Sequence, residues 1–181
     1  MLDRLLACAI LAFSYGLACA QTAPPANYES WGICPFECCT YRQWRADADI
    51  PVHQDRNEHS AVVFRLHRGE VVDGVTGVVV AEKAGAITIS RALRDGYIDG
   101  SAQPQLSLAA GDVIYMVSPL GEGAYLFWYQ GKVYKSGTDL AGMPGVDAGA
   151  AKFVWWKQVR NSASKSGWTR SEKFKAVDAC G

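Results

Sequence analysis

The sequence has 181 residues, and its 18 Lys and Arg residues balance 18 Asp and Glu residues, so its formal net charge is zero. This neutrality argues against nucleic acid or an anionic membrane as the main partner, because both select clustered basic residues. An apolar fraction of 49%, rich in Trp and Tyr, is enough to fill a core and excludes a disordered tail.

The first residues, MLDRLLACAILAFSYGLACA, predict a cleaved secretory signal peptide at 1–20. A charged start precedes an apolar run over 5–17, and Ala18 and Ala20 are small residues near the expected cleavage site. The run is shorter than the ~20 residues that span a bilayer, so we expect no stable membrane insertion. Lipidation at Cys19 stays open, although Gly16 stands where a lipobox normally has a branched apolar residue. We therefore expect a periplasmic or secreted protein.

Four cysteines follow the predicted signal peptide: Cys34, Cys38, Cys39 and Cys180. An even number of cysteines in an exported protein predicts disulfides. A bond between the neighbours Cys38 and Cys39 requires strained geometry, and each of the two other pairings links the 34–39 segment to Cys180. A redox or metal site is disfavoured, because three residues separate Cys34 from Cys38 and no histidine follows them closely. We expect structural disulfides, with no metal and no cofactor.

Short strands separated by turns are predicted along most of the chain, after a proline-containing lead-in at 21–30. Gly74 and Gly77 predict a kink or bulge in a long strand, and Gln130-Gly131 predicts the tight turn of a β-hairpin. Loops are expected at 94–111 and 137–149, and a helical turn at 171–177. The predicted strands are 61–67, 71–83, 86–93, 112–118, 124–129, 132–135, 153–160 and 167–170. This pattern indicates an all-β fold, a small barrel or sandwich.

Several short motifs resemble those of bacterial Src homology 3-like domains. Residues 50–52 and 62–72 are similar to the opening strand, long loop and Leu-x-x-Gly-x-x-Val turn of that family. Residues 155–159 and 166–169 are similar to its closing hairpin, and 108–115 repeat the Leu-x-x-Gly turn. The resemblance implies two barrels, at 46–100 and 104–181, after a cysteine-containing N-terminal segment at 21–45. One barrel that carries a large insert is the alternative.

The resemblance also implies a function. Exported members of this family commonly bind peptides or cell-wall components, often as accessories to peptidases, and this chain has no peptidase domain of its own. We therefore expect a non-catalytic binding module of the bacterial envelope, with a peptide, peptidoglycan or protein partner. A small exported cell-wall enzyme and an inhibitor or immunity-like partner of another envelope protein are the alternatives.

No catalytic constellation is evident in the sequence. His53, His59 and His67 invite a metal or base hypothesis, but the first two fall in a polar stretch that we expect to be an exposed loop. No nucleophile elbow of the Gly-x-Ser-x-Gly type occurs. Glu122, between two glycines, is either a turn residue or an acid at the rim of a binding site.

Aromatic residues give the strongest binding signal. Trp155 and Trp156 are adjacent in a predicted strand, so they must face opposite sides, and one of them is expected at a surface groove. We expect this hairpin and the one around Trp128 to share that groove, edged by the loop 137–149. The predicted ligand-binding residues are Trp128, Tyr129, Tyr134, Trp155, Trp156 and Glu122.

Overall fold

The computed structural model describes residues 22–98, 101–137, 139 and 149–179, and its regular elements are all β-strands. The prediction of an all-β fold is confirmed. The predicted signal peptide, Cys180 and most of the loop 137–149 lie outside the described residues. Within the described ranges, no helix is long and apolar enough to cross a membrane.

The strands alternate with short connections along the whole chain. The first seven are β1 (Tyr28–Trp31), β2 (Gln43–Ala46), β3 (Ile50–His53), β4 (Val62–Leu66), β5 (Val71–Lys83), β6 (Gly85–Thr88) and β7 (Leu93–Asp95). The next seven are β8 (Leu106–Leu108), β9 (Val113–Gly121), β10 (Ala124–Tyr129), β11 (Lys132–Lys135), β12 (Lys152–Arg160), β13 (Ser166–Thr169) and β14 (Phe174–Lys175).

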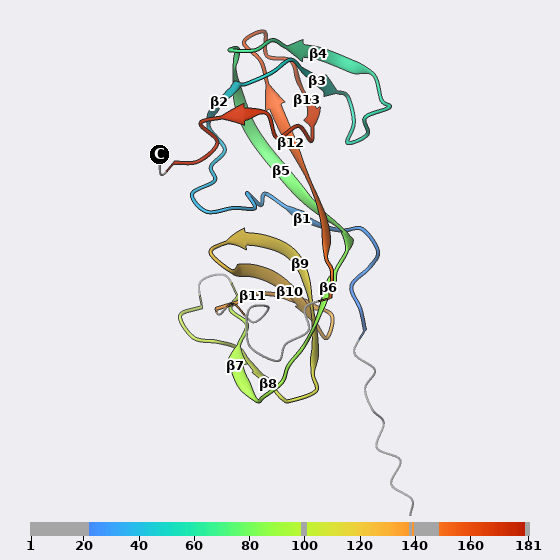
Figure 1. The fold of residues 1–181 in the computed structure, drawn as a ribbon, viewed down its shortest axis with the longest axis vertical. Helices are drawn as coiled ribbons and strands as arrows, with labels where there is room; N and C mark the ends of the chain where they lie inside the picture. Colours follow the sequence, from blue (N-terminus) through green and yellow to red (C-terminus); the bar gives the residue numbers. More distant parts are fainter. Residues whose placement is uncertain (1–21, 99–100, 138, 140–148, 180–181) are drawn as a thin grey trace, which may run out of the picture.

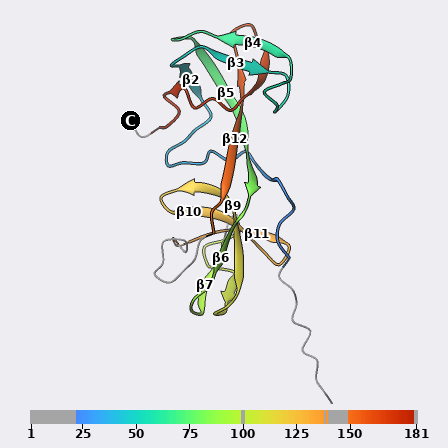
Figure 2. The ribbon, with the colours of Figure 1, turned by 45° about the vertical axis from the view of Figure 1, so that its right-hand side comes forward.

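Strands β5 and β12 form a long antiparallel ribbon along the molecule (Figures 1 and 2). Their pairing runs from Lys83 opposite Lys152 to Asp73 opposite Arg160. The Val-rich sequence of β5 favours this extended conformation. A register shift between Gln158 and Val159 is a bulge beside the glycines of β5, which confirms the predicted bulged strand.

One end of the ribbon belongs to a curled eight-stranded sheet, drawn at the top of Figure 1. Its order is β14-β2-β5-β12-β13-β3-β4, and β1 pairs with the other end of β5. The sheet encloses an apolar core centred on Trp44, whose side chain is almost fully buried. The remaining buried core residues are Ala46, Ile50, Val52, Leu66, Val72 and Val159.

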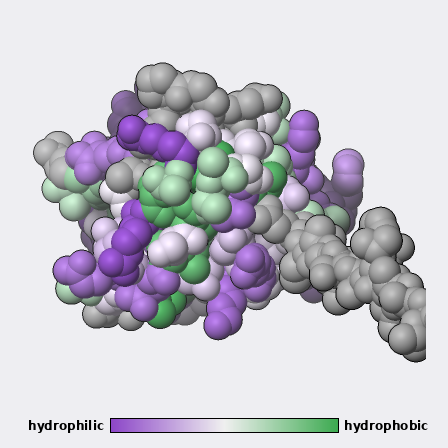
Figure 3. Space-filling view, turned by 90° about the horizontal axis from the view of Figure 1, so that it is seen from below, coloured by the Kyte–Doolittle hydropathy of each residue, from purple (hydrophilic) through white to green (hydrophobic). Residues whose placement is uncertain are grey.

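A second sheet, of order β11-β10-β9-β6, lies at the other end of the ribbon with the small hairpin β7–β8 (Figure 1). Its own core is centred on Phe127, which is completely buried. Strands β10 and β11 form the predicted hairpin, and Gln130 and Gly131 both have positive φ, as a type I′ turn requires. Seen from below, apolar residues gather in the middle of the surface and polar residues surround them (Figure 3).

Three local predictions were wrong. The lead-in at 21–30 contains most of β1, which pairs with β5. The loop predicted at 94–111 contains β8, which pairs with β7 around a polar connection. The helical turn predicted at 171–177 is instead an extended segment that contains β14. In each case the pairing partner provides hydrogen bonds that the local sequence does not indicate.

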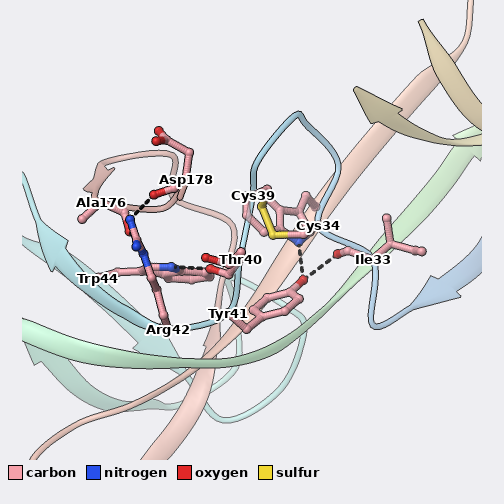
Figure 4. The surroundings of a disulfide bond; sticks show 10 residues. Ile33, Cys34, Cys39, Thr40, Tyr41, Arg42, Trp44, Ala176 and Asp178 are labelled. Carbon is pink, nitrogen blue, oxygen red and sulfur yellow. Dashed lines mark hydrogen bonds between the residues drawn. A yellow bond between two sulfur atoms is a disulfide. The ribbon is translucent and has the colours of Figure 1, made fainter. Parts of the chain in front are cut away.

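The C-terminal segment packs on the loop between β1 and β2, residues 32–42, which we call the cysteine-rich loop (Figure 4). Cys34 and Cys39 form a disulfide across this loop, and the Arg42 guanidinium donates hydrogen bonds to the backbone oxygens of Ala176 and Asp178. The Ala179 N–H donates to the Cys38 oxygen at 2.7 Å. A disulfide that forms in the native protein indicates an oxidising compartment.

We predict that Cys180 is bonded to Cys38. Cys38 is disulfide-bonded, Cys34 and Cys39 bond to each other, and Ala179 already contacts the Cys38 backbone. The closed loop spans most of the chain, so Cys180→Ser should lower the free energy of unfolding by ~4–5 kcal/mol in the chain-entropy model.

Thiol labelling and peptide mass mapping test this pairing. Cys38→Ser should expose a reactive thiol at Cys180, whereas Cys39→Ser, the matched control, should expose one at Cys34. A reactive Cys180 thiol in the folded, oxidised wild-type protein contradicts the prediction.

Candidate functional site

The two adjacent tryptophans of β12 face opposite sides of the ribbon, as the strand period predicts. Trp155 lies opposite Val79 of β5, and Trp156 lies opposite Val78. Trp155 is half-buried and lines a cavity with Phe153 and Lys157, whereas Trp156 is buried and lines a groove on the other face. The ribbon therefore brings the two rings to separate surfaces and not to one shared groove.

The cavity on the Trp155 side has a volume of about 720 Å³. We call it the Trp155 cavity and define it by Phe36, Pro119, Trp155, Lys157, Glu172 and Phe174. Its walls come from segments far apart in the sequence, namely the cysteine-rich loop, β9, β12, and the final extended segment with β14. Mainly apolar walls with a few polar groups are typical of a binding site.

Trp155 is held in place by a chain of polar contacts. Its indole Nε1 donates to the Tyr41 hydroxyl at 3.2 Å. That hydroxyl donates to the Ile33 oxygen at 2.5 Å, as Figure 4 shows. Burial raises the pKa of Tyr41 to about 12, and the hydrogen bond from Trp155 acts in the opposite direction. Tyr41 therefore stays protonated and keeps its donor at physiological pH.

Gly77 of β5 makes room for this arrangement. A Cβ atom at position 77 would lie 2.5 Å from the Trp155 Nε1 and even closer to the Tyr41 oxygen, so it would force these groups to move. The absence of a side chain therefore allows both polar groups to approach the ribbon. The Phe36 ring then meets the Trp155 ring edge to face, at 5.7 Å between centroids.

Lys157 is the most unusual charged group of the cavity. Its side chain is almost completely buried, its Nζ lies 4.1 Å from the Trp155 ring centroid, and it donates long hydrogen bonds to the Trp155 and Arg170 oxygens. Burial lowers its pKa to about 8, and the charge of Glu172 opposes this shift. A strongly perturbed lysine in a cleft is a mark of a functional site.

We predict that Lys157→Met stabilises the protein at neutral pH. The unfolded chain binds a proton more tightly than the folded protein, with pKa values of 10.5 and about 8, so wild-type stability should rise as pH increases through this window. The difference corresponds to about 3 kcal/mol, and the variant should gain up to this amount at neutral pH.

Denaturant unfolding of Lys157→Met at pH 7 and in steps between pH 8 and 9 checks this prediction. This pH range ends below the pKa of 10.0 that Tyr41 has in the unfolded chain, so ionisation of Tyr41 contributes little to the measured slope. Lys152→Met is the matched control, because Lys152 is exposed and pairs with Glu82 at the surface. A pH slope that persists in Lys157→Met contradicts the assignment.

The other predicted ligand-binding residues lie elsewhere. Trp128 packs edge to face against Tyr28, and its Nε1 donates to the Thr22 oxygen. Tyr129 belongs to the core of the second sheet, around Phe127, and donates to the Asp112 carboxylate. Tyr134 stacks on Phe127. Their role in binding stays a prediction.

Glu122 lies exposed in the β9–β10 turn, with a φ of 48°. A hydrogen bond with its carboxyl group raises the pKa of Glu37 on the cysteine-rich loop, and charge repulsion between the two acts in the same direction. This pair lies where the loop meets the turn, since a Cβ at Gly121 would be 2.3 Å from the Glu37 nitrogen. Its role in binding also stays a prediction.

The three histidines lie in different environments. His53 is buried at the end of β3, where its Nδ1 contacts the Ser60 oxygen at 3.1 Å, so the expectation of an exposed loop is wrong for this residue. His59 is exposed, and His67 lies 3.6 Å from Asp49. Among the described residues, no group of three or more His, Cys, Asp or Glu side chains could hold a metal ion.

Sequence reasoning missed most of the cavity walls. The positions of Phe36, Lys157 and Phe174 beside Trp155 depend on pairings between distant segments, which the local sequence does not indicate. The spacing of Phe153, Trp155 and Lys157 on one face of a strand was the available signal.

Comparisons with known protein families, curated proteins and solved structures give no match to this chain.

Proposed function

We propose that this protein is a non-catalytic binding module that holds an apolar side chain of a peptide in the Trp155 cavity. The observation that carries the proposal is an aromatic cavity whose central ring is fixed by hydrogen bonds before any ligand arrives. A prearranged aromatic site binds with a smaller entropic cost than a flexible one.

The polar groups of the cavity favour a peptide. Exposed Lys175 can donate to a backbone oxygen, and exposed Glu172 can accept from a backbone N–H. Asp178 and the buried Lys157 also line the cavity, so its basic and acidic residues balance. A ligand without strong net charge suits these surroundings, with its affinity supplied by apolar burial and stacking.

The sheet order supports a Src homology 3-like barrel as the scaffold. Strands β5, β12 and β13 are neighbours, β14 and β2 complete one side, and the hairpin β3–β4 completes the other. In this proposal the barrel is single, and the segment between β5 and β12 is a large insert. Two tandem barrels at 46–100 and 104–181 are the alternative.

The oxidising compartment supports an exported location, in the periplasm or outside the cell. The predicted signal peptide agrees with this location. The physiological ligand is then a peptide segment of the bacterial envelope, either free or part of a larger protein or peptidoglycan.

We predict that Phe36→Ala weakens peptide binding about tenfold or more while leaving stability nearly unchanged. Phe36 is 39% exposed and covers Trp155, so its loss removes contact area at the cavity mouth more than core packing. Peptides selected from a random displayed library against the oxidised protein provide the probe, and calorimetry provides the affinity.

Ile98→Ala is the matched control, because Ile98 is an exposed apolar residue outside this cavity. Trp155→Phe keeps an aromatic ring but removes the indole donor, and it should also weaken binding. Equal affinity of Phe36→Ala, Trp155→Phe and wild-type protein for every selected peptide rejects the cavity as the binding site.

A further inference from the structure

A second aromatic surface lies on the opposite face of the ribbon. We call it the Trp31 groove and define it by Trp31, Arg56, Trp156 and Trp168. Its volume is about 540 Å³, and Glu29, Asp55 and Glu82 are among the polar residues that line it. It lies where β1, the connection after β3, β12 and β13 come together.

Trp31 is exposed but held in a fixed position. It is 55% exposed, the largest value among the exposed large apolar residues of the described chain. Its ring meets Trp168 edge to face at 5.9 Å, and its Nε1 donates to the Glu29 carboxylate at 3.0 Å. A rigid exposed indole is unusual on a protein surface and indicates recognition.

Arg56 fixes both rings at once. Its guanidinium carbon lies 4.9 Å from the Trp31 centroid and 5.7 Å from the Trp168 centroid. The same guanidinium binds Glu29 at 2.7 Å. Cation–π contact and the ion pair together orient the aromatic pair and leave more than half of Trp31 open to solvent.

Two of the three carboxylates of the groove form ion pairs within the protein. Glu29 pairs with Arg56, and Glu82 pairs with Lys152 at 2.6 Å. An ionic ligand would have to compete with these pairs. Carboxylate oxygens that already hold one cation can still accept hydrogen bonds from hydroxyl groups, because each oxygen has more than one acceptor site.

From this arrangement we infer that the Trp31 groove binds a neutral saccharide. A pyranose ring with equatorial hydroxyl groups presents a patch of C–H groups on each face, which can stack on the exposed indole of Trp31. Its hydroxyl groups extend outward from the ring edge, where Glu29, Asp55 and Glu82 provide acceptors and Arg56 provides donors. Neither a purely apolar nor a charged ligand matches both features.

This site is independent of the Trp155 cavity. The two surfaces take alternate residues of β12, with Val154 and Trp156 on one face and Phe153 and Trp155 on the other. No residue lines both the Trp31 groove and the Trp155 cavity. Loss of one binding activity should therefore leave the other unchanged.

Titration of the oxidised protein with the tetrasaccharides of β-1,4-linked N-acetylglucosamine and β-1,4-linked glucose tests the inference, with intrinsic Trp fluorescence and calorimetry as readouts. We expect binding of at least one of them with a Kd of about 1 mM or tighter. Trp31→Ala should weaken it at least about tenfold, and Trp31→Phe, which keeps a ring, should weaken it less.

Phe36→Ala is the control variant, because it alters the other face and should leave saccharide affinity unchanged. Circular dichroism and unfolding of Trp31→Ala should match the wild type, since the removed ring is mostly exposed. Failure of both saccharides to bind overturns the inference, as does binding that Trp31→Ala leaves intact. Preferential binding of an oligoarginine peptide, sensitive to Trp31→Ala, overturns it in favour of a cationic ligand.

Discussion

The pairing of β5 with β12 is the constraint on which the rest of the structure depends. Nine residue pairs join the two strands along their length, the eight-stranded sheet and its core include both strands, and the second sheet begins with β6 directly after β5. Because successive side chains of a strand alternate, this ribbon directs Trp155 to one surface and Trp156 to the other. The two candidate binding surfaces follow from that alternation.

The cysteine-rich loop completes one of these surfaces. The disulfide between Cys34 and Cys39 closes the loop, and the Tyr41 hydroxyl joins Ile33 to the Trp155 indole. These contacts place the Phe36 ring over Trp155. The loop therefore links a covalent restraint directly to the mouth of the Trp155 cavity, the site of the proposed peptide binding.

Local features of the fold were predictable from the sequence, and long-range ones were not. The hairpin around Gln130-Gly131 and the alternation of Trp155 and Trp156 depend on turn chemistry and strand period, which neighbouring residues determine. The short strands β1, β8 and β14 depend on distant partners. Arg56 and Trp168 are far apart in the sequence, so no local pattern indicated that they would meet at Trp31.

The most direct test of this account is an NMR titration that follows the six Trp indole N–H signals while a library-selected peptide is added. We expect the Trp155 signal to shift or broaden, because its N–H belongs to the ring that contacts the peptide, while the Trp31 and Trp168 signals stay unchanged. Shifts confined to Trp31 and Trp168, with Trp155 unaffected, would contradict it.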